Sequence, residues 1–231
     1  MKVLVVVPAY NEVKSITGVI SDLRENFPQG DILVINDGSR DNTSAVAKGL
    51  GVNVIDLPYN LGIGGAMQTG FVYALRGGYD AAVQFDGDGQ HVASEILNIF
   101  GPFEKNGTDL VVGSRFLSES GFTSSIQRRL GAKILSFVVS AIVGKRITDT
   151  TSGFRVYSKK AVEFFASIYP EDYPEVEAFI LAHKKGLIIE EVPAEMTGRK
   201  FGKSSITMKK AVYYMIKVLL AIFVDLLKKI D

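Results

Sequence analysis

Two aspartates, Asp86 and Asp88, stand one residue apart at the end of a short apolar run, and glycines occupy positions 87 and 89. Glycine allows the tight turn that would direct both carboxylates toward one point. Hard divalent cations such as Mg²⁺ and Mn²⁺ prefer oxygen ligands. Asp86, Asp88 and the backbone carbonyl of Gln90 therefore predict a metal site, completed by water or substrate phosphates. The alternative is a polar turn that merely closes a strand.

The segments around these carboxylates alternate between strand patterns and helix patterns. Runs of apolar and β-branched residues predict strands at Lys2–Val7, Asp31–Ile35, Val52–Leu57, Ala81–Phe85 and Leu110–Gly113. Helices are predicted at Glu12–Asn26, Thr43–Lys48, Ala66–Leu75, Ile96–Phe100 and Ile126–Val143. This alternation is typical of an α/β fold, with a mostly parallel sheet and helices on both of its faces.

Polar clusters follow four of the predicted strands. They are Pro8–Glu12, Asn36–Asp41, Asp86–Gln90 and Ser114–Arg115. In open α/β sheets ligands bind beyond the carboxyl ends of the strands, so we expect these clusters to converge there. The glycine-rich residues 62–65 precede a predicted helix. Either they form a flexible entry to that helix, or their backbone amides approach a ligand phosphate.

Composition and charge exclude several classes of protein. The 231 residues are 47% hydrophobic and 22% charged, as in ordinary globular proteins, which excludes a disordered or fibrous chain. The absence of cysteine excludes disulfides, a thiol nucleophile and a cysteine-based zinc site. The net charge of +1 gives no indication of nucleic-acid binding. This charge is unevenly distributed, because residues 197–231 carry +6 and the preceding residues carry −5.

The C-terminal residues 206–231 predict a basic amphipathic helix. Its apolar face consists of Met208, Val212, Met215, Leu219, Ile222 and Leu226, widened by Ala211, Ile216, Leu220 and Phe223. Lysines at its ends and flank suit the interface of an anionic membrane. The alternatives are packing on the body of the protein or a seam between copies. The sequence shows no signal peptide and no apolar run of the roughly 20 residues that a membrane span needs.

Eight segments between residues 8 and 204 form an ordered series of motifs. They are Pro8–Glu12, Ile35–Asp41, Asn60–Gly62, Asp86–His91, Gly113–Arg115, Asp149–Arg155, Glu191–Pro193 and Arg199–Ser204. Together they resemble the family 2 glycosyltransferases of the GT-A fold, and most closely the branch of dolichyl-phosphate and other polyprenyl-phosphate sugar transferases. Ser205 departs from this pattern, because relatives commonly carry lysine directly after the motif serine.

The resemblance implies a role for individual residues. The nucleotide-sugar site would include Pro8, Tyr10, Glu12, Ile35, Asp37, Gly62, Asp86, Gly87, Arg115, Arg199 and Ser204. Asp86, Asp88 and Gln90 would hold Mg²⁺ or Mn²⁺, and Asp88, Asp149 and Arg115 would be the catalytic set. Candidates for binding an acceptor phosphate are Arg128, Arg129, Arg155 and Lys203. For Arg128 and Arg129 a solvated helix face is an equal alternative, and for Arg155 a structural ion pair.

The resemblance also implies a function. A GT-A catalytic domain at residues 1–205 would transfer a hexose with inversion from a nucleotide sugar, preferably a UDP-sugar, to polyprenyl phosphate. The enzyme would be cytoplasmic and peripheral on the inner face of the cell membrane, with a small membrane protein partner left open. One alternative is a polysaccharide or lipid-linked glycan acceptor, for which Asp149 would act as a true base. The other is a non-catalytic nucleotide-sugar-binding subunit of a membrane complex.

Overall fold

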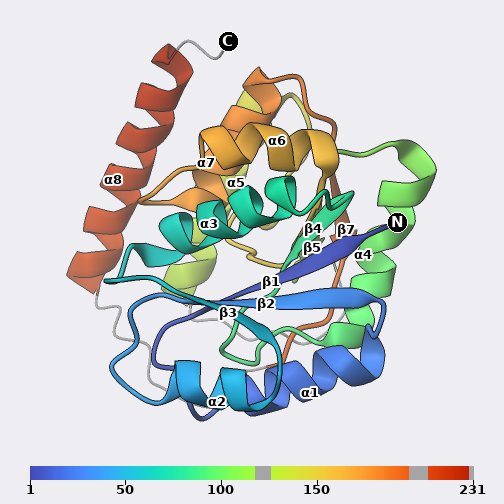
Figure 1. The fold of residues 1–231 in the computed structure, drawn as a ribbon. Helices are drawn as coiled ribbons and strands as arrows, with labels where there is room; N and C mark the ends of the chain where they lie inside the picture. Colours follow the sequence, from blue (N-terminus) through green and yellow to red (C-terminus); the bar gives the residue numbers. More distant parts are fainter. Residues whose placement is uncertain (118–125, 198–207, 229–231) are drawn as a thin grey trace.

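The computed structural model describes residues 1–117, 126–197 and 208–228, which place a seven-stranded sheet between two layers of helices (Figure 1). The strand order is β3-β2-β1-β4-β6-β5-β7, and β6 runs antiparallel to both of its neighbours while the other pairs are parallel. The predicted α/β fold with a mostly parallel sheet is confirmed. The strands are β1 Val3–Ala9, β2 Gly30–Asn36, β3 Asn53–Asp56, β4 Ala81–Gln84, β5 Leu110–Ser114, β6 Arg155–Ser158 and β7 Ile189–Pro193.

Helices cover both faces of the sheet. One core lies beneath α3, α5, α6, α7 and α8, and the other beneath α1, α2 and α4. The helices are α1 Ile16–Asn26, α2 Thr43–Gly49, α3 Gly62–Arg76, α4 Ile96–Asn106, α5 Ile126–Val143, α6 Lys159–Ser167, α7 Pro174–Lys184 and α8 Met208–Leu227, with the short 3₁₀ helix η1 Ala93–Glu95 before α4.

Strand β1 explains why the N-terminal run is apolar throughout. Val5 and Val7 point into the core shared with α1 and α4, whereas Leu4 and Val6 point into the core shared with α3. All seven residues of β1 are buried. A strand covered on both faces has no position at which a polar side chain would be solvated.

The first helix begins later than predicted. α1 starts at Ile16 and not near Glu12. Asn11 has a φ of 57°, and the carbonyl of Glu12 accepts the amides of Ser15 (3.1 Å) and Ile16 (2.9 Å). Residues 11–15 therefore form a turn at the end of β1, which keeps this polar cluster at the edge of the sheet.

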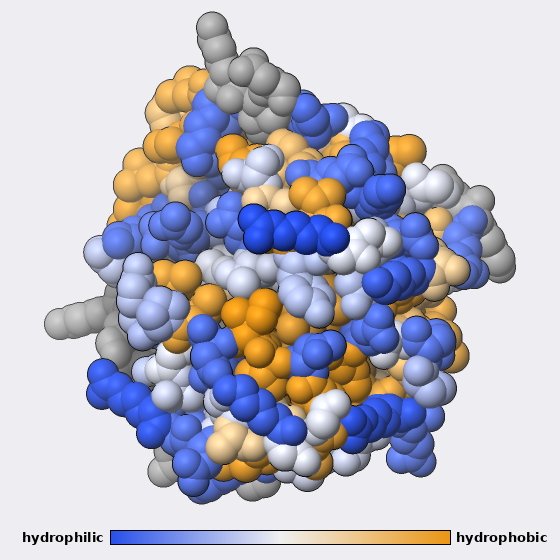
Figure 2. Space-filling model, in the orientation of Figure 1, coloured by the Kyte–Doolittle hydropathy of each residue, from blue (hydrophilic) through white to orange (hydrophobic). Residues whose placement is uncertain are grey.

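The C-terminal helix α8 packs on the body through a face that coincides only in part with the one predicted: Met215 and Ile222 belong to both. Val218, Ile222 and Asp225 are buried, and the first two join the core beneath α7. Residues assigned to the apolar face, such as Leu220 and Phe223, are more than half exposed. Figure 2 shows the visible surface of α8 as largely hydrophobic. α8 is thus apolar both on the side that meets the body and on a side that the described residues leave uncovered.

Within the described ranges, no helix combines the length and the apolar character that crossing a membrane requires.

Candidate functional site

The polar clusters converge at one edge of the sheet, beyond the carboxyl ends of β1, β2, β4 and β5. Asn11 Oδ1 accepts the N–H of Arg40 (2.8 Å), which joins the clusters after β1 and β2. The N–H of Gly87 donates to the carbonyl of Pro8 (3.2 Å), which joins the cluster after β4 to the end of β1. Because β6 runs in the opposite direction, its amino end brings residues 149–154 to the same edge.

A buried histidine orients the first aspartate. The N–H of Asp86 donates to Nδ1 of His91 (2.9 Å), so a neutral imidazole carries its proton on Nε2, which lies 3.5 Å from Asp86 Oδ2. The ring of His91 stacks on Phe154, with centroids 4.8 Å apart. Burial lowers the pKa of His91, although the charges of Asp86 and Asp88 oppose this effect. His91 is thus a neutral support for the aspartate.

The aspartate loop offers a cation two carboxylates. Oδ1 of Asp86 is buried and has no hydrogen-bond partner, which is costly for a carboxylate oxygen unless a ligand completes it. The carbonyl of Gln90, predicted to be a third ligand, accepts the N–H of Thr197 (2.8 Å). Among the described residues, no group of three or more histidine, aspartate or glutamate side chains is placed to hold a metal. The pair therefore fits a cation that takes its remaining ligands from phosphates and water.

Asp37 secures the start of α3. Its carboxylate accepts the N–H groups of Leu61 (2.7 Å) and Gly62 (3.0 Å), and the side chain is almost completely buried. These amides at the helix N-terminus already have an anionic partner from the chain itself. This arrangement competes with the interpretation that residues 62–65 receive a phosphate. The predicted role of Asp37 at a base or ribose stays a prediction.

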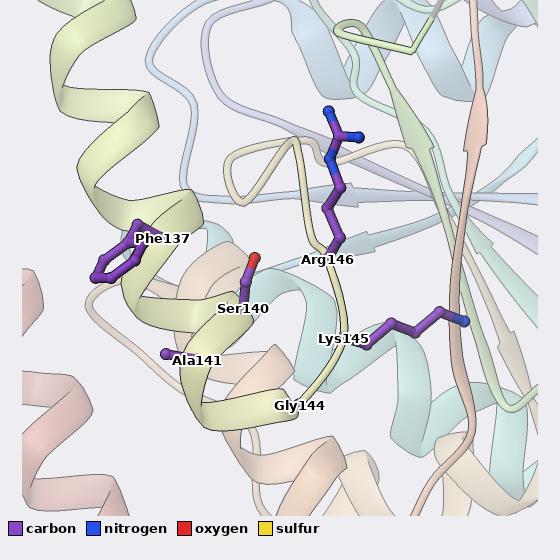
Figure 3. A pocket seen from close by; sticks show the side chains of 6 residues that line it. All are labelled: Phe137, Ser140, Ala141, Gly144, Lys145 and Arg146. Carbon is purple, nitrogen blue, oxygen red and sulfur yellow. The ribbon is translucent and has the colours of Figure 1, made fainter.

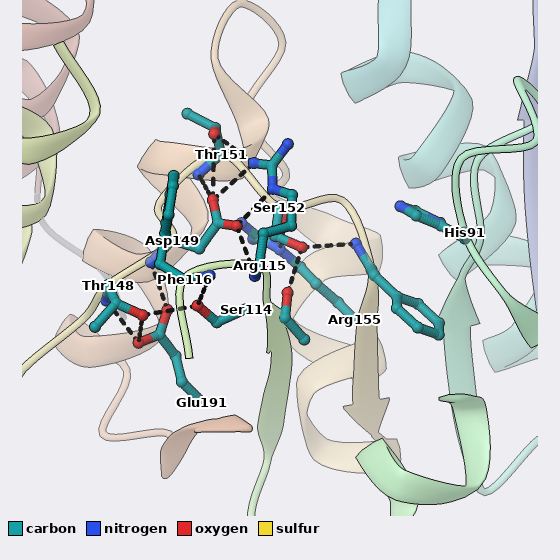
Figure 4. A network of polar contacts seen from close by, with 12 residues as sticks. His91, Ser114, Arg115, Phe116, Thr148, Asp149, Thr151, Ser152, Arg155 and Glu191 are labelled. Carbon is teal, nitrogen blue, oxygen red and sulfur yellow. Dashed lines mark hydrogen bonds and ion pairs between the residues drawn. The ribbon is translucent and has the colours of Figure 1, made fainter. Parts of the chain in front are cut away.

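Arg115 and Asp149 form a bidentate ion pair at the centre of the site (Figure 4). Nε and Nη2 of Arg115 donate to Oδ2 and Oδ1 of Asp149, each at 2.7 Å, and the Arg115 N–H also donates to Oδ2 (3.1 Å). Thr151 donates its N–H and its hydroxyl to Oδ1, each at 3.3 Å. Burial disfavours the Arg115 cation, but the bonds and charge of Asp149 outweigh it and raise the Arg115 pKa. Asp149 is fully buried, and both of its oxygens are engaged.

Two predicted residues lie deeper than expected. Ile35 is fully buried in the core beneath α3. Arg155 is also fully buried. Its Nε donates to the Ser152 carbonyl (2.7 Å), and its Nη2 donates to the Glu175 carbonyl (2.6 Å). The guanidinium carbon lies 4.8 Å from the ring centroid of Phe179. The structure therefore places neither side chain on a surface that a nucleotide or an acceptor phosphate could reach. Arg155 instead braces α7 against the segment before β6.

The remaining predicted residues fall into two groups. Tyr10 is exposed at the end of β1, and Glu12 accepts the Ser15 hydroxyl (2.6 Å). Arg199, Lys203 and Ser204 lie outside the described residues, as do the side chains of Arg128 and Arg129, so their roles stay predictions.

The structure adds residues that the sequence interpretation did not assign. Thr148, Thr151 and Glu191 join the network around Asp149 in Figure 4. Each stands in or next to a motif of the ordered series, and this position is the only feature of the sequence that points to a role in the site. Thr148 and Glu191 are 43 positions apart in the chain, and Thr151 and Arg115 are 36 apart, so spacing alone could not reveal these contacts.

A shallow hollow of about 370 Å³ lies elsewhere, at the carboxyl end of α5 (Figure 3). It is lined by Phe137, Ser140, Ala141, Gly144, Lys145 and Arg146. None of the predicted site residues lines it, so we do not count it as part of the site.

Comparison with known proteins shows which family the chain matches. The model of the family described as glycosyl transferase family 2 matches residues 4–165. The chain is 34% identical over 211 residues to a UDP-N-acetylglucosamine–dolichyl-phosphate N-acetylglucosaminyltransferase of Methanococcus voltae, covering 83% of this chain and 84% of the relative. It is 30% identical over 227 residues to a polyprenol monophosphomannose synthase of Mycolicibacterium smegmatis, covering 94% and 85%.

The fold is shared with a solved structure of lower sequence similarity. Glucosyl-3-phosphoglycerate synthase of Mycobacterium tuberculosis, crystallised with Mn²⁺, UDP and phosphoglyceric acid, superposes with a TM-score of 0.72 at 17% identity. The match covers 97% of this chain and 78% of the other.

Proposed function

Because this chain belongs to glycosyl transferase family 2, we propose that it transfers a hexose from a nucleotide sugar, preferably a UDP-sugar, to polyprenyl phosphate. The observation that carries the proposal is the set of charged side chains gathered at one edge of the sheet. There a carboxylate pair with a buried, unpartnered oxygen lies in the same set of loops as a rigidly held arginine. That combination suits a diphosphate, which needs both a cation and a directed positive charge.

The proposed chemistry assigns separate tasks to the two halves of the site. Asp86 and Asp88 would hold Mg²⁺ or Mn²⁺, which supplies charge stabilisation to the departing nucleoside diphosphate. Arg115 faces the same developing negative charge from the opposite loop. Its guanidinium is pre-oriented by Asp149, so little reorganisation is needed when the sugar–phosphate bond breaks.

The acceptor explains why a strong base is not required. A polyprenyl phosphate is already ionised at pH 7, so its oxygen can attack the anomeric carbon directly, with inversion in a single displacement. The geometry of Asp149 supports this division, because both of its oxygens are occupied by Arg115 and Thr151. A true base would need an oxygen facing the acceptor hydroxyl, as the glycan-acceptor alternative requires.

The names of the relatives support the choice of acceptor. The M. voltae and M. smegmatis relatives are named for dolichyl phosphate and for a polyprenol monophosphate sugar. The exposed apolar side of α8 suits a protein that works at the cytoplasmic membrane surface, where such an acceptor resides. A small membrane protein partner would be an addition to this arrangement and not a condition of it.

The test is sugar transfer to a short polyprenyl phosphate. UDP-glucose, UDP-N-acetylglucosamine and GDP-mannose are each offered with Mn²⁺, Mg²⁺ or EDTA, beside an Asp88→Asn control. Lipid-linked product from one donor, lost with EDTA and in the control, is expected, and the anomeric configuration of the product tests inversion. Metal-dependent release of nucleotide with a glycan acceptor instead would favour the polysaccharide alternative. If both sugar transfer and nucleotide release are absent, an enzymatic role is contradicted.

A further inference from the structure

The backbone of residues 148–149 sets the position of the Arg115–Asp149 pair, and that backbone is held by a side chain from another strand. Glu191 on β7 accepts the N–H of Thr148 at Oε2 (2.6 Å) and the N–H of Asp149 at Oε1 (2.8 Å). The Thr148 hydroxyl donates to Oε2 as well (3.0 Å). Both oxygens of one carboxylate are thus used to fix two successive amides.

The same segment is anchored to β5, the strand that leads to Arg115. Oγ of Ser114 lies 2.7 Å from Oγ1 of Thr148, and it accepts the N–H of Phe116 (3.2 Å). β7 pairs in parallel with β5, with Glu191 opposite Val112. Glu191 therefore acts within the framework that carries both partners of the ion pair, as Figure 4 shows.

A carboxylate suits this position better than any neutral side chain. Two parallel N–H groups need two acceptors on one short planar group, and an amide side chain would present an N–H to one of them. Burial raises the pKa of Glu191, and its hydrogen bonds to the amides of Asp149 and Thr148 oppose this effect.

We propose that Glu191 is a positioning residue for the transfer reaction: it fixes the amides of Thr148 and Asp149 and thereby, through the Asp149 carboxylate, sets the direction of the Arg115 guanidinium. The consequence for catalysis rests on the proposed function, whereas the structural linkage from Glu191 to Arg115 does not. Glu191 touches no reacting atom in this scheme.

The test compares Glu191→Gln with Glu190→Gln. Glu190 is the adjacent residue on the same strand, and its carboxylate accepts the Thr108 hydroxyl (3.2 Å) away from the site. Glu190→Gln therefore removes the same charge without touching the residues around Asp149. We expect kcat of Glu191→Gln to fall about 10- to 100-fold with the KM for nucleotide sugar changed less than about threefold, because an interaction used in the transition state is lost. Glu190→Gln should stay close to the wild type in both constants.

A double-mutant cycle tests whether Glu191 acts through Asp149. If it does, adding Glu191→Gln to Asp149→Asn should lower kcat by less than about threefold further, because the ion pair is already broken. Fully multiplicative losses would overturn the proposal. If Glu191→Gln fails to fold, Glu191→Asp keeps the charge but shortens the reach, and the same cycle applies.

A measurement that does not depend on sugar transfer separates this inference from the proposed function. The ¹⁵N–¹H resonance of Arg115 Nε, assigned with Arg115→Lys, reports its bond to Asp149. It should shift or broaden in Glu191→Gln and not in Glu190→Gln. An unchanged resonance would refute the linkage even if transfer is observed. A shifted resonance in a protein that transfers no sugar would leave the linkage standing and contradict the proposed function.

Discussion

Asp86 lies against Gly153, the residue that faces it from the amino end of β6. A Cβ atom at position 153 would lie 2.9 Å from Oδ2 and 3.1 Å from Oδ1 of the Asp86 carboxylate. Nε2 of His91 lies 3.5 Å from Oδ2 of the same carboxylate. The carboxylate therefore occupies space that any side chain larger than hydrogen at position 153 would need. Its position thus depends on residue 153 being glycine.

Gly153→Ala is expected to weaken metal binding without removing a ligand. The added methyl group pushes the Asp86 carboxylate away from its place, and changes around metal ligands commonly lower metal affinity about 10- to 100-fold. The measurement is the concentration of Mn²⁺ that gives half-maximal transfer. Gly101→Ala on α4 is the control, because a Cβ there meets nothing within 4 Å. Equal Mn²⁺ requirements in both variants would refute the contact.

The sequence predicts a group of site residues better when they are neighbours in the chain than when they are far apart. Asp86 and Asp88 were predicted as a pair because they stand together beside glycines. The ion pair of Arg115 and Asp149 joins residues 34 positions apart, which no spacing rule connects. Arg155 was a candidate for an acceptor phosphate because it stands in a motif of the family, with a structural ion pair as the alternative, but the residue is fully buried and donates to backbone carbonyls.

At the scale of elements, a buried acidic pair joins α7 to α8. Glu177 and Asp225 are both nearly inaccessible, and Oδ2 of Asp225 is buried without a hydrogen-bond partner. Asp225 accepts two lysine ammonium groups: Lys228 Nζ donates to Oδ1 (2.6 Å), and Lys184 Nζ donates to the backbone carbonyl (2.6 Å). Glu177 Oε2 accepts the N–H of Tyr173 (3.0 Å). A proton on Glu177 that is donated to Asp225 would satisfy the unpartnered oxygen.

This pair should make stability depend on pH. Burial, a hydrogen bond to Asp225 and the charge of Asp225 raise the pKa of Glu177 from its ordinary 4.5 to about 7. Between these values the folded state binds the proton that the unfolded state has lost, so stability decreases as pH rises through this window. Wild-type melting temperature should fall from pH 5 to pH 8. Glu177→Gln should remove most of this fall, whereas exposed Glu163→Gln on α6 should leave it. A wild-type curve that is flat over this range would contradict the shared proton.

The elements themselves were predictable where burial makes the pattern continuous. β1, β4 and β5 are buried throughout and β2 is buried from Leu33 to Asn36, because helices cover both of their faces. β6 escaped prediction because it is short and begins with a buried arginine. β7 escaped because it is a partly exposed edge strand that contains Glu190 and Glu191. The turn at residues 11–15 resembled a helix start in the sequence, but Asn11 adopts a left-handed conformation.

At the scale of the whole molecule, α8 presents an apolar stripe away from the body. The stripe consists of Tyr213, Ile216, Leu220, Phe223 and Leu227, each more than half exposed. Spacings of three and four residues place them along one side of the helix. The surrounding C-terminal residues carry the positive charge of the chain, while the rest is mildly acidic. Apolar surface beside positive charge is the combination that binds the interface of anionic membranes.

The stripe is expected to carry the protein to vesicles that contain anionic lipid. Each large apolar side chain that leaves water contributes about 1.5–3 kcal/mol, so Leu220→Ser with Phe223→Ser should weaken vesicle partitioning at least about tenfold. Raising the ionic strength should weaken it further, because the basic residues are screened. Leu97→Ser removes an equally exposed leucine from α4 on the other face of the sheet and should change nothing. Loss of a dimer, with vesicle binding intact, would mean that a second copy covers the stripe.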